Sequence, residues 1–189
     1  VVEKAVEDEL LEKITNIGKS IQPGDPYDPT TAMGTIVDKT QFERVLGYID
    51  IGKNEGAKVF SGGEKAEPVK GGVFIKPTVF QNVKPGMRIE REEIFGPVLA
   101  SIAVESADEA VRIANDTQYG LATTIWTTNL ARAHTVAAKI DVGITWVNSW
   151  FLRDLRTAFG GSKQSGIGRE GGVHSLEFYT ETRNICIKL

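Results

Sequence analysis

Arginine and aromatic residues are concentrated near position 150 of this 189-residue chain. The segment Trp150–Arg156 carries Arg153 and Arg156 beside aromatic side chains, and Phe159 follows it. A guanidinium is a planar fork that binds a carboxylate through paired hydrogen bonds. One of the two arginines is therefore a candidate ligand for an acidic group. The alternative is that they cap helix ends or pair with Asp154.

Glycines crowd the next stretch, Phe159–Glu170, and allow close backbone approach to a ligand. Residues 166–171 match the dinucleotide fingerprint G-x-G-x-x-G. That fingerprint works between a strand and a helix, with an acidic residue on a second strand about 20 residues later. Here a loop precedes it and the sequence ends soon after. The pattern favours a turn-rich site loop over a phosphate-binding loop.

Acidic and basic residues alternate over Arg88–Glu93, directly before the sharp turn Phe95–Pro97. Such a cluster is commonly a solvated face with local ion pairs. However, the turn would fix Glu93 beside a strand end, and ligands bind at strand ends of parallel sheets. Both interpretations of Glu93 stay open at this stage.

Cysteine and histidine offer little chemistry. Cys186 is the single cysteine, and the alternating pattern around it favours a structural thiol over a nucleophile. Neither His134 nor His174 has a companion at metal-ligand spacing. The sequence predicts no metal site.

The elements that must position these residues follow from apolar periodicity. Helices are predicted over 3–21, 40–54, 106–120 and 130–140, the second opened by a Thr40/Glu43 capping box and the third by Ser106/Glu109. Strands are predicted over 57–60, 73–80, 98–104, 121–126 and 142–147, and Pro77 indicates an edge strand or a bulge. Alternating strands and helices indicate an α/β fold, with a mostly parallel sheet covered by helices. A last alternating pattern, Arg183–Leu189, predicts a strand that completes a sheet elsewhere, such as on another subunit.

Composition limits the class of protein. The chain is 41% hydrophobic and 25% charged with a net charge of −3, which gives no basic field for nucleic acid. No apolar run approaches the ~18 residues that span a bilayer, and one cysteine excludes an internal disulfide framework. We expect a cytoplasmic protein. Val1 and Val2 suggest the end of an earlier strand, so we also expect a fragment.

Three segments, Glu92–Val98, Ala114–Ala122 and Phe159–Glu170, resemble the C-terminal part of the NAD(P)-dependent aldehyde dehydrogenase superfamily. The resemblance implies a three-layer α/β/α catalytic domain over 1–164, less its first residues, and a C-terminal segment over 165–189 that ends in an oligomerisation strand. In that family a cysteine thiolate attacks the aldehyde, hydride passes to the nicotinamide, and a glutamate activates the hydrolytic water. The resemblance implies that this cysteine and glutamate lie upstream of Val1, so the isolated chain is expected to be inactive.

The resemblance also implies roles for individual residues. Glu93 matches the glutamate that binds the nicotinamide ribose, and Phe95 matches the aromatic residue near the nicotinamide ring. Glu170 matches a glutamate assigned to proton relay, and Phe159 matches an aromatic residue of the aldehyde tunnel. Arg153 stands where many relatives place another tunnel aromatic.

The stretch Trp150–Thr157 most resembles the 2-hydroxymuconate and 2-aminomuconate semialdehyde dehydrogenases of aromatic catabolism, whose substrates carry a carboxylate. This implies an aldehyde such as 2-hydroxymuconic semialdehyde, NAD or NADP as cofactor, and a homodimer or homotetramer. Ala158 departs from the family, which usually has proline there. The alternatives are an enzyme for betaine aldehyde or another aliphatic aldehyde, and a non-catalytic assembly fragment.

Overall fold

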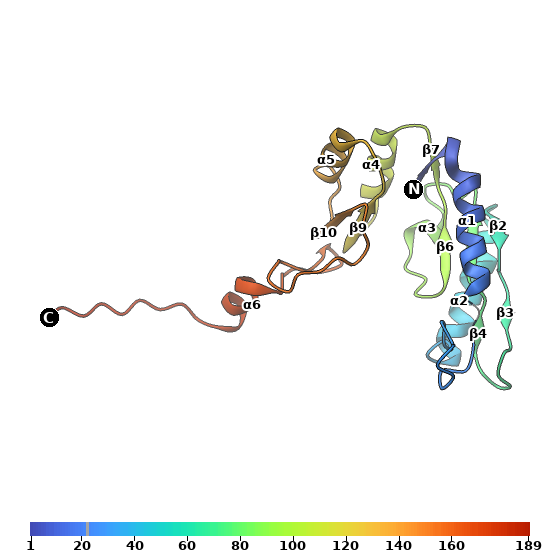
Figure 1. The fold of residues 1–189 in the computed structure, drawn as a ribbon, viewed down its shortest axis with the longest axis horizontal. Helices are drawn as coiled ribbons and strands as arrows, with labels where there is room; N and C mark the ends of the chain where they lie inside the picture. The colour runs from blue at the N-terminus through green and yellow to red at the C-terminus, as the bar shows by residue number, and fades with distance from the viewer. Residues whose placement is uncertain (22) are drawn as a thin grey trace. The chain divides into compact units, whose positions relative to one another are not determined.

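The computed structural model describes residues 1–21 and 23–189 and contains two compact units, Val1–Ala110 and Val111–Leu189 (Figure 1). Both units combine helices with short strands, and both contain parallel strand pairs, which confirms the predicted α/β class. The first unit contains β1 (Val2–Glu3), the 3-10 helix η1 (Lys4–Val6), α1 (Glu7–Ser20), α2 (Lys39–Asn54), β2 (Lys58–Ser61), β3 (Lys65–Ala66), β4 (Phe74–Ile75), β5 (Thr78–Gln81), α3 (Arg88–Arg91), β6 (Val98–Ala100) and β7 (Ala103–Val104). The boundary falls within α4 (Ala107–Asn115), and the second unit continues with β8 (Tyr119–Gly120), β9 (Ala122–Ile125), α5 (Leu130–Ala137), β10 (Ile144–Val147), β11 (Ser162–Lys163) and α6 (Gly172–Tyr179).

The sheet of the first unit has the strand order β2-β5-β6. Its central strand, β5, is buried along its whole length, pairs antiparallel with β2 and runs parallel to β6. The predicted strand 73–80 is therefore two strands, β4 and β5, separated by Lys76 and Pro77. The expectation of an edge strand is wrong. Pro77 lies just before β5, where its missing N–H costs no ladder hydrogen bond.

The helices of the first unit differ from the prediction in their starts and faces. Asp38 caps α2 by accepting a hydrogen bond from the Gln41 N–H at 2.7 Å, so Thr40 is not the cap. On α1 the buried residues are Glu7 and Leu11, whereas Leu10, one of the apolar residues whose spacing predicts this helix, is exposed. Burial of the Glu7 carboxylate is compensated by the Ser101 hydroxyl, which donates to it at 2.7 Å.

The second unit is organised around the parallel pair β9 and β10, which α5 connects as a βαβ unit. Strands β8 and β11 pair antiparallel and attach the glycine-rich loop to this unit. The predicted capping box of α4 is confirmed, because the Glu109 N–H donates to the Ser106 hydroxyl at 3.2 Å.

The C-terminal tail after α6 has no helix or strand from residue 180 to 189 (Figure 1). Within the described part of the chain, the predicted strand Arg183–Leu189 has no pairing partner. Cys186 lies on this tail and is exposed, and its assignment as a structural thiol stays a prediction.

Across residues 1–21 and 23–189, no helix has the length and apolar character needed to span a membrane. The compact units divide at residue 110, whereas the predicted functional division lies at 164/165. The division into a catalytic part and a C-terminal segment stays a prediction.

Candidate functional site

An aromatic loop follows the carboxyl end of β10. The Trp146 indole Nε1 donates to the Leu152 carbonyl at 2.8 Å, and the ring of Trp150 meets that of Trp146 edge-to-face at 5.3 Å between centroids. The Thr124 hydroxyl of β9 donates to the Ser149 carbonyl at 2.8 Å. Both strands therefore fix the loop that carries the candidate arginines.

The two arginines of this loop have different partners. Arg156 pairs with Asp154 through both carboxylate oxygens, from Nε to Oδ1 at 2.9 Å and from Nη2 to Oδ2 at 2.6 Å. These hydrogen bonds hold the pKa of Asp154 below its usual value. For Arg156, pairing with Asp154 is thus the correct alternative.

Arg153 instead contacts both Phe159 and Glu170. Its guanidinium carbon lies 3.9 Å from the centroid of the Phe159 ring, and its Nη2 donates to Glu170 Oε1 at 2.6 Å. The Arg153 side chain is 31% exposed and that of Glu170 is 63% exposed. Three residues predicted separately as substrate-binding or catalytic therefore form one cluster, which we call the Arg153 cluster.

The backbone of the glycine-rich loop closes on itself at Phe159 and Glu170. Each of these residues donates its N–H to the other's carbonyl, at 2.8 and 2.7 Å. A side chain at Gly143 would collide with the Gly160 carbonyl, so only glycine permits this close approach. The Arg169 guanidinium donates to the Gly161 carbonyl at 2.6 Å inside the loop. The Arg169 guanidinium is thus bound to the backbone of its own loop, which favours the interpretation as a turn-rich site loop over a phosphate-binding loop.

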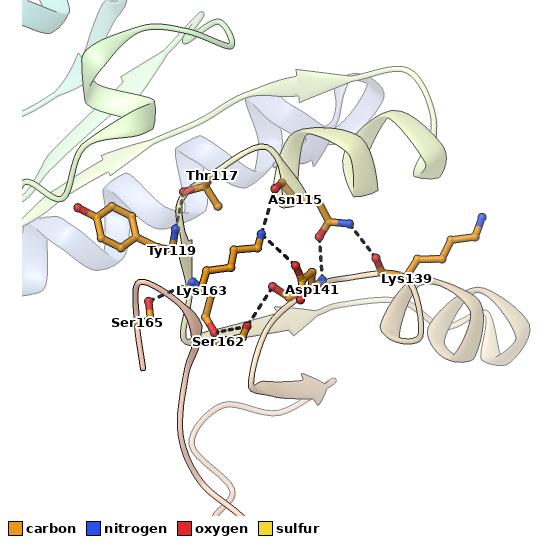
Figure 2. A network of polar contacts seen from close by, with 9 residues as sticks. Asn115, Thr117, Tyr119, Lys139, Asp141, Ser162, Lys163 and Ser165 are labelled. Carbon is orange, nitrogen blue, oxygen red and sulfur yellow. Dashed lines mark hydrogen bonds and ion pairs between the residues drawn. The ribbon is translucent and has the colours of Figure 1, made fainter. Parts of the chain in front are cut away.

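A polar network attaches the same loop to the ends of α4 and α5 (Figure 2). Lys163 Nζ donates to the Asn115 carbonyl at 3.0 Å and lies 3.6 Å from an Asp141 carboxylate oxygen. The Asn115 side chain donates to the Lys139 carbonyl at 2.8 Å and accepts from the Asp141 N–H at 2.8 Å. The loop is therefore held at Lys163 as well as by the backbone hydrogen bonds between Phe159 and Glu170.

A pocket of about 400 Å³ opens on the second unit beside Phe159 and Glu170. Its walls are formed by the glycine-rich loop, by residues of α6 and by the residue between β8 and β9: Leu121, Phe159, Gly160, Gly161, Ser165, Gly166, Gly168, Arg169, Glu170, Ser175, Phe178 and Tyr179. An apolar pocket with few charged groups is the usual form of a small-molecule site.

Glu93 and Phe95 lie in the first unit, on a segment that α2 holds by its backbone. Arg44 Nη2 donates to the Glu93 carbonyl at 2.7 Å, and Gln41 Nε2 donates to the Ile94 and Phe95 carbonyls at 3.0 Å. Phe95 has a φ of 55° and a ring that is 74% exposed. A positive φ is rare for a bulky residue and persists only where surrounding contacts impose it.

This segment precedes β6, so it lies at the amino end of that strand. The rule that ligands bind at carboxyl ends of parallel strands does not apply here, and that argument for Glu93 was wrong. Its neighbour Glu92 is bound by Arg88 and by the Tyr48 hydroxyl, and these hydrogen bonds lower the pKa of Glu92 to about 2. With the described residues, the Glu93 carboxylate itself makes no hydrogen bond or ion pair.

No group of three or more His, Cys, Asp or Glu side chains within residues 1–21 and 23–189 could hold a metal ion.

Comparison with known proteins identifies the family. The profile of the aldehyde dehydrogenase family matches residues 1–185. The chain belongs to this family. It is 49% identical to a 2-hydroxymuconic semialdehyde dehydrogenase of Pseudomonas sp. strain CF600, over 100% of this chain and 39% of that protein. It is also 44% identical to a 2-aminomuconic 6-semialdehyde dehydrogenase of Pseudomonas sp., with the same coverage of each.

Among solved aldehyde dehydrogenases, an indole-3-acetaldehyde dehydrogenase of P. syringae, in complex with NAD+ and IAA, has a TM-score of 0.94 and 42% identity over 100% of this chain and 38% of its own. The aldehyde dehydrogenase KauB from Pseudomonas aeruginosa has a TM-score of 0.94 and 46% identity with the same coverage. This aldehyde dehydrogenase chain thus spans about two-fifths of the length of the relatives that it matches.

The sequence indicated candidate site residues one by one but missed the residues that hold them in place. Gln41 and Arg44, which fix the Glu93–Phe95 backbone, lie on a helix that carried no functional signal. The pairing of Arg153 with Glu170 joins positions 17 residues apart and was also missed. In the sequence, the one signal for this pairing was that Arg153 precedes the glycine-rich loop and Glu170, of opposite charge, ends it.

Proposed function

We propose that this chain is the C-terminal part of an NAD-dependent aldehyde dehydrogenase that oxidises a carboxylate-bearing semialdehyde such as 2-hydroxymuconic semialdehyde. We call the longer protein that would contain it the complete enzyme. The observation that carries the substrate class is Arg153: its guanidinium, held against Phe159, already binds a carboxylate. The identity of 49% to a 2-hydroxymuconic semialdehyde dehydrogenase supports the same class.

The cofactor proposal rests on Glu93 and Phe95. An exposed carboxylate without a partner among the described residues, on a backbone held by α2, suits the hydroxyl groups of a ribose, and the exposed Phe95 near it suits a nicotinamide. Bound NAD+ would supply the hydride acceptor, and NADP+ is the alternative cofactor. Solved relatives in complex with NAD+ support the proposal.

For the aldehyde, we propose that Arg153 binds the distal carboxylate while Phe159 forms an apolar wall. Glu170 is proposed to accept or relay a proton near the reacting carbon. An aldehyde, NAD+ and water would give a carboxylic acid, NADH and a proton. The nucleophilic cysteine and the base that activates water are proposed to belong to the rest of the complete enzyme, so the isolated chain should show no turnover with NAD+ and aldehyde.

The test is a comparison of two substrates in the complete enzyme. Arg153→Ala should raise KM for 2-hydroxymuconic semialdehyde by roughly 30-fold, equivalent to a charge-assisted hydrogen bond of about 2 kcal/mol. KM for a neutral aldehyde of similar length should stay within about twofold. Arg156→Ala is the matched control, because that guanidinium is satisfied by Asp154. Equal effects of Arg153→Ala on both aldehydes would contradict the proposal.

A second candidate substrate is betaine aldehyde. Trp146, Trp150 and Phe151 place their ring centroids 5.3 to 6.3 Å apart, and aromatic faces bind quaternary ammonium groups. The identity of 42% between this chain and a betaine aldehyde dehydrogenase of Mesorhizobium japonicum supports this candidate. The positive Arg153 opposes it. A kcat/KM for betaine aldehyde above that for the acidic semialdehyde would favour this candidate.

We also propose that the complete enzyme is a cytoplasmic homo-oligomer. Apolar side chains on the tail, Ile185, Ile187 and Leu189, alternate along an extended backbone and are exposed. Such an unpaired edge is suited to pairing with a sheet of another subunit. Deleting residues 183–189 should convert the oligomer to monomers by light scattering. An unchanged molar mass would contradict this role.

A further inference from the structure

In the Arg153 cluster, the Glu170 carboxylate occupies the position on Arg153 that we propose for the carboxylate of the substrate. Nη2 of Arg153 donates to Glu170 Oε1 at 2.6 Å, and this is the hydrogen bond that the guanidinium makes with described residues. The guanidinium face is covered by the Phe159 ring at 3.9 Å. Glu170 therefore occupies a ligand position on a preformed recognition group.

The contact with Glu170 uses one nitrogen of the guanidinium and one oxygen of the carboxylate. The neighbouring Arg156 shows the alternative geometry, because both oxygens of Asp154 engage its Nε and Nη2. A two-point contact of this kind is the stronger form of the arginine–carboxylate interaction. A substrate carboxylate that engages Arg153 through both oxygens would exchange a weaker contact for a stronger one.

Displacing the Glu170 carboxylate from Arg153 also costs little free energy. Its side chain is 63% exposed, so the released carboxylate returns to water, and exposed ion pairs contribute little net stability. The reciprocal hydrogen bonds with Phe159 at 2.8 and 2.7 Å involve only the Glu170 backbone, so they are kept when the side chain moves away from Arg153. A change of side-chain rotamer is enough to vacate Arg153.

We propose that Glu170 is an internal competitor for Arg153: it pairs with the guanidinium in the free enzyme and is released when an acidic aldehyde binds. This inference rests on the proposed function, since it requires that Arg153 receives the substrate's carboxylate. Glu170 is then a specificity-determining residue that acts through Arg153. It keeps the arginine paired when a neutral aldehyde is bound and weakens binding of every acidic one.

The decisive variant is Glu170→Gln in the complete enzyme. An amide of the same shape accepts a weaker hydrogen bond than a carboxylate, so competition falls. KM for 2-hydroxymuconic semialdehyde should decrease by roughly twofold to fivefold, while KM for the neutral aldehyde stays unchanged. The value of kcat is expected to fall for both substrates if Glu170 also relays protons. A residue with a merely structural role would not lower one KM selectively.

Further variants make the test independent of one substitution. Glu170→Ala should lower the same KM, and Glu170→Asp should restore part of the competition. In the double variant Arg153→Ala/Glu170→Gln, the KM for the acidic aldehyde should equal that of Arg153→Ala, because no guanidinium is left to compete for. Glu177→Gln, the same charge change on α6, is the matched control. Thermal melting of each variant identifies any that fails to fold.

The outcomes separate the two proposals. If Arg153→Ala leaves KM for the acidic aldehyde unchanged, the proposed substrate class fails and the competitor role fails with it. If Arg153→Ala raises that KM but Glu170→Gln and Glu170→Ala raise it or leave it unchanged, the substrate class stands and the competitor role is overturned.

Discussion

The two candidate segments of this chain treat their charged side chains in opposite ways. In Glu93–Pro97, helix α2 fixes the backbone carbonyls and leaves the Glu93 carboxylate without a partner among the described residues. In the loop from Arg153 to Glu170, the Arg153 and Glu170 side chains bind each other. The first segment is ready for a ligand, whereas the second must break a contact to receive one. A shared cofactor suits the first arrangement, and discrimination between aldehydes suits the second.

The largest expected effect concerns the backbone under the second segment. Gly143→Ala in the complete enzyme would drive a methyl group into the Gly160 carbonyl. Gly160 follows Phe159, whose backbone is held by hydrogen bonds to Glu170. We expect a loss of about 3 kcal/mol in the free energy of unfolding, the upper end of what overpacking typically costs, because the methyl group meets backbone atoms that cannot easily move. Gly168→Ala, where a side chain meets no atom within 4 Å, is the control. Equal melting temperatures for the two variants would show that the loop is not held by this contact.

The next effect concerns the first segment. Gln41→Ala removes both hydrogen bonds to the Ile94 and Phe95 carbonyls. Since two such bonds contribute about 1 to 2 kcal/mol, Kd for NAD+ should rise roughly tenfold, measured by fluorescence titration of the complete enzyme. KM for the aldehyde should change little. Lys39→Ala, on the same helix and exposed, is the control. A larger effect on KM for the aldehyde than on Kd for NAD+ would contradict the proposed division of roles.

How far the sequence predicted these segments depends on how local each feature is. The βαβ unit of β9, α5 and β10 followed from local periodicity and was confirmed. The helix predicted over 3–21 is present as α1, but apolar spacing alone did not reveal that Glu7 is buried on it, because its partner Ser101 lies far along the chain. Likewise, Thr40 and Glu43 fit a capping box, but Asp38 accepts the capping hydrogen bond.

The candidate site shows the same limit. The family motifs indicated Arg153 and Glu170 one by one, yet their contact depends on the closing of the loop between Phe159 and Glu170. Gln41 and Arg44 were invisible because they act on backbone carbonyls about 50 residues away, and a backbone carbonyl leaves no signal in a sequence. Long-range support of this kind has to be read from the fold.

A pH experiment tests whether Glu92 anchors the first segment. Hydrogen bonds from Arg88 and Tyr48 lower its pKa from 4.5 to about 2. A lowered pKa in the folded state stabilises the protein above the unfolded value, and this contribution is lost as the pH falls from about 4.5 towards 2. Urea unfolding of wild type and Glu92→Gln should therefore differ most at pH 5 and converge towards pH 2. A constant difference across this range would contradict the assignment.

The smallest expected effect returns to the second segment and its two arginines. Asp154→Asn removes the carboxylate that pairs with Arg156, but the Asp154 carbonyl that accepts from Thr157 remains. Because the Arg156 side chain is 87% exposed, its released charge is screened by water, and KM for the acidic aldehyde should change by less than about twofold. Arg153 lies against Phe159 and is less exposed, so its charge is less screened and is the one proposed to meet an acidic aldehyde. A decrease in KM comparable to that expected for Glu170→Gln would mean that a freed Arg156 recruits the substrate as effectively as Arg153, and the distinction between the two arginines would be lost.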